Sequence, residues 1–311
     1  MKRQIATLMA VLATLCALAQ QTYQYVTRND STHLLLDVYR PANPRADHAC
    51  VLYMFGGGFY LGERNSEHVV LGCQRLADRG FTVVSIDYRL GLRDADLAKA
   101  NLFNVHSYFE NAVSVAVQDC SAAIAWICNH ADELAIDTSH IILTGNSAGA
   151  ISVLQTDYCR ANSLPDAAEL PQSFKPLAVV PYAGGIICRN SKLHYATEPA
   201  PTCFFHGTAD RIVNYKRLRS SLSTSQFGAD RVAKEFSRKG FDHWVLRFDG
   251  LGHEVASYLP YTIEEFVAFV DAVEAGRHMD YDAHCTDSRF VPTEWSKRTV
   301  FDLYLRNNVA N

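Results

Sequence analysis

The chain has 311 residues, of which 48% are hydrophobic and 20% charged, and its formal net charge is −4. This composition is ordinary for a globular protein, and the length allows one large α/β domain or two small ones. The negative charge and the lack of a Lys/Arg cluster in the sequence exclude the basic footprint of a nucleic-acid-binding protein.

Residues 1–19 have the pattern of a secretory signal peptide. Lys2 and Arg3 precede an almost entirely apolar stretch, and residues 17–19 (ALA) fit the small-x-small cleavage pattern. The stretch is short for a membrane span, so we expect cleavage after Ala19 and no stable membrane insertion; a retained N-terminal anchor is the alternative. This predicts an exported protein, periplasmic or extracellular, with a mature chain (20–311) that forms a single domain.

Short apolar runs alternate with helical patterns along the rest of the chain. Two strands around a polar turn predict an N-terminal antiparallel hairpin. The later runs predict a mainly parallel central sheet with helices on both faces, which is an α/β fold. The predicted strands are 22–28, 33–40, 50–55, 81–87, 140–144, 177–182, 202–206 and 244–248, and the predicted helices are 66–79, 117–131 and 261–275.

Two segments stand outside this alternation. Residues 91–116 are rich in aromatic and polar residues without a clean period. Because connections of this length in compact domains are often lids or binding loops, we expect a lid or insert here. Residues 276–311 contain several aromatic residues, and we expect them to form a C-terminal extension that packs back on the domain.

The cysteines leave their pairing open. An even number in an exported protein permits disulfides, and buried cysteines also serve as small apolar core residues. None of them has zinc-finger spacing, so we expect no structural metal. The chemistry inferred below from the serine motif implies no cofactor either. The cysteines after the leader are Cys50, Cys73, Cys120, Cys128, Cys159, Cys188, Cys203 and Cys285.

The most informative motif lies at residues 145–149 (GNSAG), between an apolar run and a predicted helix. This is the layout of a nucleophile elbow, a sharp strand-to-helix turn that exposes a serine hydroxyl. The glycines of such a turn let the strand and the helix approach each other closely. The motif predicts Ser147 as a nucleophile, against the alternative of an ordinary glycine-rich turn.

A serine hydroxyl becomes an effective nucleophile when a base removes its proton and a third group orients that base. In a parallel sheet, functional residues gather in loops after the carboxyl ends of strands. Asp210 follows the predicted strand 202–206, and His253 follows the predicted strand 244–248. Ser147, Asp210 and His253 therefore form a candidate catalytic triad in the chain order of α/β-hydrolases.

Other residues compete for these roles. Asp210 has an alternative interpretation as a helix cap, and His253 as a surface-loop histidine. Further candidate acids and bases lie at less suitable positions relative to the predicted strands: Asp242, Asp249, His206 and His243.

An acyl-transfer site also needs donors for the negative charge that develops on the carbonyl oxygen. Residues 56–58 (GGG) directly follow the predicted strand 50–55, where backbone N–H groups are able to point at a ligand without side-chain obstruction. We predict the oxyanion-hole donors to be the backbone N–H groups of Gly57, Gly58 and Ala148, the last being the residue after the nucleophile.

Taken together, these motifs resemble the carboxylesterase and hormone-sensitive-lipase-like group of the α/β-hydrolase superfamily. Residues 56–62 (GGGFYLG), 85–90 (SIDYRL) and 145–149 (GNSAG) are similar to the glycine loop, the D-Y-R-L segment and the elbow of that group. Residues 206–210 (HGTAD) and 252–253 (GH) resemble its acid and base loops. The resemblance covers about residues 50 to 270 and implies an α/β-hydrolase fold.

The resemblance implies a secreted serine esterase that works through an acyl-enzyme. By analogy, the expected substrates are short-chain esters or acetyl and feruloyl esters linked to polysaccharide. Two alternatives stay open: a peptidase of the prolyl-oligopeptidase type and a non-catalytic binding protein on the same scaffold. The oligomeric state is not predicted.

Aromatic and polar residues near the predicted site are candidates for lining a substrate pocket: Phe59, Tyr60, His106 and Tyr182. Asp87 and Arg89 are expected to form a structural polar pair behind the glycine loop.

Overall fold

The computed structural model describes residues 20–93, 95, 99, 104–188, 192–219, 224–299 and 302. The predicted leader (1–19) lies outside the described residues, as do residues 94, 96–98 and 100–103 of the segment predicted as a lid.

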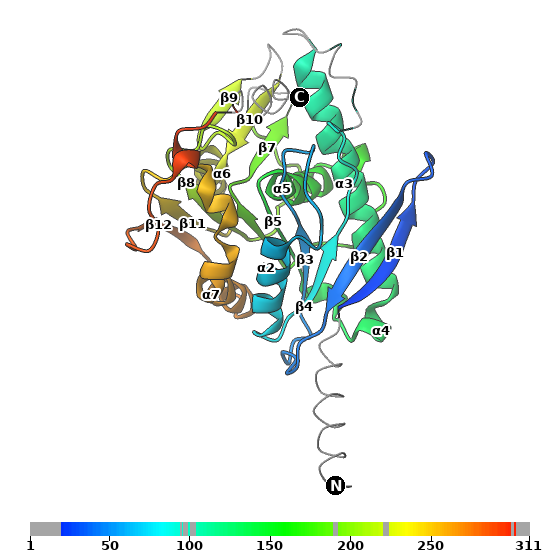
Figure 1. The fold of residues 1–311 in the computed structure, drawn as a ribbon. Coiled ribbons are helices and arrows are strands. Elements are labelled where there is room, and N and C mark those ends of the chain that lie inside the picture. The colour runs from blue at the N-terminus through cyan, green and yellow to red at the C-terminus, as the bar shows by residue number, and fades with distance from the viewer. Residues whose placement is uncertain are drawn as a thin grey trace, which may run out of the picture.

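A twisted nine-stranded sheet runs through the centre of the described fold (Figure 1). The β1–β2 and β2–β4 pairs are antiparallel, and all the other pairs in the sheet are parallel. The prediction of a mainly parallel sheet with an N-terminal hairpin is therefore confirmed. In spatial order the strands are β1 (Gln21–Thr27), β2 (His33–Tyr39), β4 (Thr82–Ile86), β3 (Cys50–Met54), β5 (Ile141–Asn146), β6 (Ala178–Tyr182), β8 (Thr202–Gly207), β11 (His243–Phe248) and β12 (Asp280–Cys285).

Helices cover both faces of this sheet, as an α/β fold requires. Figure 1 shows α2 and α7 in front of the sheet, while α3 and α5, which contact each other, lie behind it. The α-helices are α2 (Glu67–Ala77), α3 (Val105–Asn129), α4 (Ala131–Leu134), α5 (Ala148–Ala161), α6 (Ala229–Lys239) and α7 (Ile263–Glu274). Short 3₁₀ turns are η2 (Thr138–His140), η3 (Pro165–Ala167), η4 (His253–Ser257), η5 (Leu259–Tyr261) and η6 (Glu294–Ser296).

Helix α3 begins twelve residues before the predicted start at residue 117. Its first turns belong to the segment that we expected to form a lid or insert. The mixture of aromatic and polar residues there shows no helical period in the sequence, and tertiary packing stabilises the helix. Phe109 lies edge-on against Phe59, and Ala112 is fully buried. Helix α3 is also long and apolar enough to span a membrane, but 61% of its apolar window is buried inside the fold, as in a core helix.

Between β6 and β11, helix α6 and three strands were not predicted from the sequence. The three strands are β7 (Gly185–Cys188), β9 (Arg217–Arg219) and β10 (Ser225–Gly228), which form a small antiparallel sheet in the order β7-β10-β9. Each strand has only three or four residues, which is too short for a period to show in the sequence.

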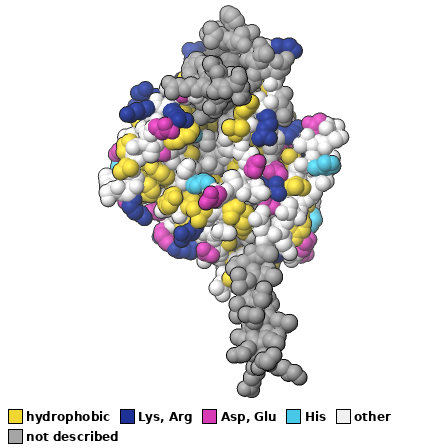
Figure 2. Space-filling model, in the orientation of Figure 1, with side chains coloured by type: hydrophobic (Ala, Val, Ile, Leu, Met, Phe, Trp, Pro, Cys, Tyr) yellow, Lys and Arg dark blue, Asp and Glu magenta, His cyan; other side chains and the backbone are white. Residues whose placement is uncertain are grey.

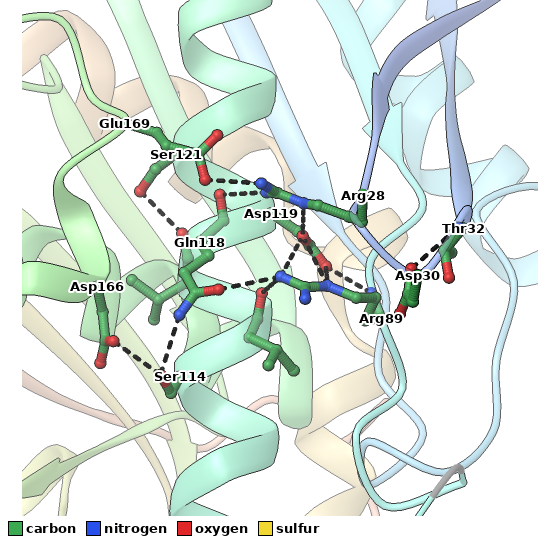
Figure 3. A network of polar contacts seen from close by, with 12 residues as sticks. Arg28, Asp30, Thr32, Arg89, Ser114, Gln118, Asp119, Ser121, Asp166 and Glu169 are labelled. Atoms are coloured by element: carbon green, nitrogen blue, oxygen red, sulfur yellow. Dashed lines mark hydrogen bonds and ion pairs between the residues drawn. The ribbon is translucent and has the colours of Figure 1, made fainter.

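A buried carboxylate ties the N-terminal hairpin to the core (Figure 3). Asp119 of α3 is fully buried and accepts hydrogen bonds from Arg28 Nε at 2.7 Å and from Arg89 Nε at 3.0 Å. The expected pair of Asp87 and Arg89 is therefore wrong, because Arg89 binds Asp119 while Asp87 binds Arg64 at 2.8 Å. Asp119 thus pairs with two arginines and Asp87 with one, so the negative charge of each aspartate is compensated locally.

No disulfide joins the cysteines that the structure describes. Six of them are buried, and burial raises the pKa of the Cys120 and Cys159 thiols to about 12. These thiols are protonated at neutral pH and pack as small apolar groups, which is one of the two roles left open by the sequence.

Positive and negative side chains of the described residues are interspersed on the face drawn in Figure 2, with hydrophobic side chains between them. A mixed surface of this kind fits the small net charge of the chain.

Candidate active site

Ser147 lies at the sharp turn between β5 and α5, with backbone angles φ 53° and ψ −117°. A non-glycine residue rarely adopts positive φ, and such strain is typical of functional positions. The flanking glycines are sterically required, since a Cβ on Gly149 would lie 2.0 Å from the Met54 carbonyl oxygen and one on Gly145 2.6 Å from the same atom. The turn also receives support from β6, because Ser147 N donates to the Tyr182 carbonyl at 2.9 Å.

The structure brings Ser147, His253 and Asp210 together from three separate loops. Ser147 Oγ lies 2.8 Å from His253 Nε2, and His253 Nδ1 lies 2.8 Å from Asp210 Oδ2. Each of these loops follows the carboxyl end of a parallel strand, β5, β8 or β11, so the sheet places all three side chains at one edge. The geometry is that of a serine nucleophile, a general base and an orienting carboxylate.

Both carboxylate oxygens of Asp210 have hydrogen-bond or ion-pair partners. Its Oδ1 accepts from Ile212 N at 2.8 Å and Val213 N at 3.1 Å, while its Oδ2 faces His253 and also His206 Nε2 at 3.3 Å. Burial opposes the charge on Asp210, but the charge and hydrogen bonds of His253 and His206 outweigh it and hold the pKa of Asp210 well below its ordinary value. The carboxylate therefore stays ionised and fixes the imidazole of His253 with Nδ1 as the donor.

The acid and base loops meet directly. A Cβ on Gly207 would lie 2.3 Å from the Gly252 carbonyl oxygen and 2.4 Å from that of Leu251. Thr208 N donates to the Phe248 carbonyl at 3.0 Å, and Ala209 N donates to the Leu251 carbonyl at 2.8 Å. These contacts set the distance between Asp210 and His253, and they explain why a glycine opens the acid loop.

The glycine loop, residues 56–62, lies against the nucleophile turn. A Cβ on Gly56 would lie 2.8 Å from the Asn146 carbonyl oxygen and 3.1 Å from Ser147 Cβ. Gly57 has φ +131°, and its carbonyl accepts from Tyr60 N and Leu61 N. Ala148 begins α5, where backbone N–H groups have no intrahelical partner. The predicted donors Gly57, Gly58 and Ala148 thus belong to two segments that meet beside Ser147.

The D-Y-R-L segment (85–90) and Leu92, just after it, pack against the glycine loop. The Tyr88 hydroxyl donates to the Phe55 carbonyl at 2.7 Å, and Leu92 N donates to the Phe59 carbonyl at 3.0 Å. Rings of Phe55 and Tyr88 lie 4.5 Å apart. This segment therefore has a structural role in shaping the loop that faces the nucleophile.

Two of the four predicted pocket residues pack in the core. Phe59 is fully buried against Tyr88 and Phe109, and Tyr182 is fully buried with its ring stacked on Phe205. Burial of these large aromatic rings stabilises the core, and neither side chain is accessible to a substrate in this conformation. Tyr60 and His106 are partly exposed.

The competing acids and bases lie elsewhere, with one exception. Asp249 pairs with His284 at 2.6 Å, Asp242 with His278 at 2.7 Å, and His243 Nδ1 with the Phe241 carbonyl at 2.9 Å. His206 is the exception, because it contacts Asp210 from within the core.

Sequence reasoning missed the residues that contact the base loop from the C-terminal extension. The ring of Trp295 lies 6.4 Å from that of His253, centroid to centroid, and Ser296 Oγ accepts a hydrogen bond from Gly252 N at 3.2 Å. The aromatic content of residues 276–311 was the one available signal, and it indicated packing without indicating the place.

Part of the chain is similar in sequence to known proteins. A family model described as BD-FAE matches residues 36–163. Lipase 2 of Moraxella sp. (strain TA144) is 34% identical over 104 residues, which are 33% of this chain and 20% of that protein. An arylesterase of Saccharolobus solfataricus is 30% identical over 141 residues, 44% of this chain and 39% of that protein. The chain thus spans well under half the length of these curated relatives.

Solved structures extend the likeness to most of the fold. A thermophilic esterase of Thermogutta terrifontis, Est2, with propionate bound, has a TM-score of 0.59 and 23% identity, covering 83% of this chain and 94% of that one. Its butyrate-bound form has a TM-score of 0.58 and 21% identity, with the same coverage. The predicted α/β-hydrolase fold is confirmed. The chain thus has the α/β-hydrolase fold, and parts of its sequence are similar to carboxylesterases and lipases.

Proposed function

We propose that this protein is a serine hydrolase that cleaves carboxylic esters through an acyl-enzyme. The observation that carries the proposal is the continuous hydrogen-bonded chain from Ser147 through His253 to Asp210, built on a strained nucleophile turn. The similarity to proteins named lipase, arylesterase and para-nitrobenzyl esterase supports the ester as the bond that is cleaved.

Each residue then has a defined role. His253 Nε2 removes the proton of Ser147 as the hydroxyl oxygen attacks the ester carbonyl, and the N–H groups of Gly57, Gly58 and Ala148 stabilise the oxyanion. The imidazolium passes the proton to the leaving alcohol, and the acyl group stays on Ser147. A water molecule then repeats the sequence and releases the acid. Asp210 stabilises the imidazolium in both steps.

We further propose short acyl groups or polysaccharide-linked acetyl and feruloyl groups as the substrates. The similar Est2 enzyme was solved with propionate and with butyrate bound, which favours a small acyl group. The signal-peptide pattern of residues 1–19 favours action outside the cytoplasm, in the periplasm or the medium.

A series of p-nitrophenyl esters from acetate to palmitate tests this function in the wild type and in Ser147→Ala. We expect hydrolysis of the short esters, falling with chain length, and its loss in the variant. Equal rates in the two proteins would exclude Ser147 as the nucleophile. Cleavage of peptide anilides in place of esters would favour the peptidase, and inactivity on both would favour the binding protein.

A further inference from the structure

The C-terminal tail segment (293–299) contacts both catalytic loops, although it lies more than 80 residues after Asp210 and 40 after His253. Ser296 is the centre of these contacts. Its Oγ accepts from Gly252 N at 3.2 Å and donates to Glu254 Oε1. Gly252 and Glu254 are the two neighbours of His253, so a single hydroxyl holds the base loop on both sides of the catalytic histidine.

A second contact reinforces the first. Thr293 N donates to Glu254 Oε1 at 3.1 Å, so this carboxylate oxygen binds both ends of the η6 turn. Glu254 is only 6% exposed, and its Oε2 has no hydrogen-bond partner among the described residues. A buried carboxylate keeps its place only when donors compensate its charge, and here the tail segment supplies two donors.

The tail segment also reaches the acid loop. Thr299 forms a parallel β-bridge with Arg211, the residue after Asp210. The two loops that carry the acid and the base are therefore joined by one piece of chain, in addition to their direct contact through Gly207.

The close approach of the tail explains the glycine before the catalytic histidine. Gly252 has backbone angles φ −105° and ψ −133°. A Cβ at this position would lie 2.4 Å from Ser296 Cα and 2.8 Å from the Trp295 carbonyl oxygen. The backbone of the tail segment occupies the space of a side chain, and this contact brings the Trp295 ring beside His253.

We propose that the tail segment is a positioning element of the active site, with Ser296 as its central positioning residue. The inference rests on the proposed function. Its physical basis is that His253 must keep Nε2 on Ser147 and Nδ1 on Asp210 at the same time. A displacement of about 1 Å in such a group can lower a rate by about a hundredfold. The tail segment limits that displacement.

Kinetics of p-nitrophenyl acetate hydrolysis by Ser296→Ala, Ser296→Thr and Gly252→Ala test the proposal. We expect kcat of Ser296→Ala to fall about tenfold or more with KM within about twofold, since the loss affects catalysis and not binding. Ser296→Thr keeps the hydroxyl and should retain most of kcat. Gly252→Ala should also lower kcat, because its Cβ displaces the backbone of the tail segment. In the double variant Gly252→Ala/Ser296→Ala, the loss in log kcat should be smaller than the sum of the two single losses.

Ser237→Ala is the matched control, because Ser237 on α6 also donates to a carboxylate, that of Asp280, which pairs with His243 at the end of β11 opposite to the base loop. It should leave kcat unchanged. Circular dichroism and melting temperature show whether each variant is folded under the assay conditions. If folded Ser296→Ala and Gly252→Ala both keep kcat within about twofold of the wild type, the positioning role is wrong.

The outcome is separable from that of the proposed function. If the wild type has no Ser147-dependent esterase activity, the esterase proposal fails. The rates at which a fluorophosphonate probe labels Ser147 in the same variants then test the positioning role without an ester substrate. Slower labelling of Ser296→Ala and Gly252→Ala than of the wild type would support the positioning role. Equal labelling rates in the variants and the wild type, or no labelling of the wild type, would overturn it.

Discussion

The two halves of the described fold carry the site in different ways. Residues 36–163 match the family model and contain the glycine loop and the nucleophile turn, where glycines and strands fix each position through backbone contacts. Asp210 and His253 lie in the second half, on loops joined by hydrogen bonds and by the tail segment. The proposed nucleophile is therefore built into the sheet, whereas the proposed acid and base depend on contacts between loops.

The largest effect is expected at the nucleophile itself. Ser147→Ala removes the attacking atom, and we expect kcat for p-nitrophenyl acetate to fall by about 10⁴-fold or more. The strained turn need not relax, because alanine fits the same backbone, so the melting temperature should change little. Initial rates and a thermal melt check both statements, and a residual rate above about 1% of the wild type would contradict them.

Loss of the orienting carboxylate should be nearly as severe. Asp210→Asn keeps the size of the side chain but removes the charge that stabilises the imidazolium, and we expect kcat to fall by about 10³- to 10⁴-fold. Steady-state kinetics at pH 8 measure the effect. A fall in kcat of less than about tenfold would assign the orienting role to another group. Asp249→Asn is the matched control, because Asp249 also pairs with a histidine, His284.

The glycine loop should show a smaller effect on catalysis. In Gly57→Ala the new Cβ would lie 2.0 Å from the Leu61 carbonyl oxygen, and φ +131° is unfavourable for alanine. The loop must then move away from Ser147, and we expect kcat to fall about 10²- to 10³-fold, as for the loss of an oxyanion donor. Gly276→Ala, which has open space around it, is the control. Equal kinetics of the two variants would argue against the oxyanion role.

The buried ion pairs of Asp119 should contribute more to the stability of the fold than the residues of the candidate site do. Asp119→Ala leaves Arg28 and Arg89 without their buried partner, and we expect a loss of about 3–5 kcal/mol in the free energy of unfolding. Urea unfolding measures it. A loss under about 1 kcal/mol would show that the hairpin is held by its backbone pairing alone.

The smallest effect concerns acid stability. Because the pKa of Asp210 is depressed in the folded protein, its contribution to stability is present above the unfolded value of about 3.9 and is lost as pH falls towards the folded value. The wild type should therefore lose more stability between pH 6 and pH 3 than Asp210→Asn does. Urea unfolding at the two pH values tests this, and identical losses would contradict it.

The sequence predicts much of the first half and less of the second for a physical reason. Apolar strands such as Cys50–Met54 and the turn at Ser147 are determined by local patterns, and the structure has them within one or two residues of the prediction. β12 has mostly exposed side chains, and the small sheet has strands of three or four residues, so no period marks them. The contact of Ser296 with Gly252 joins residues far apart in the sequence, so no local sequence pattern predicts it.

Site residues follow the same division. Ser147, Asp210 and His253 follow predicted strands, so their common edge is predictable. Whether a side chain lies in the core or in a pocket depends on packing, and the interior positions of Phe59 and Tyr182 show where prediction from chain position fails.

The most direct test of the central claim is covalent labelling with a fluorophosphonate probe, followed by peptide mapping. We expect one adduct per chain, on the peptide that contains Ser147, absent in Ser147→Ala and formed far more slowly in His253→Ala. An adduct on another residue, or equal labelling rates in the wild type and His253→Ala, would contradict a nucleophile at Ser147 activated by His253.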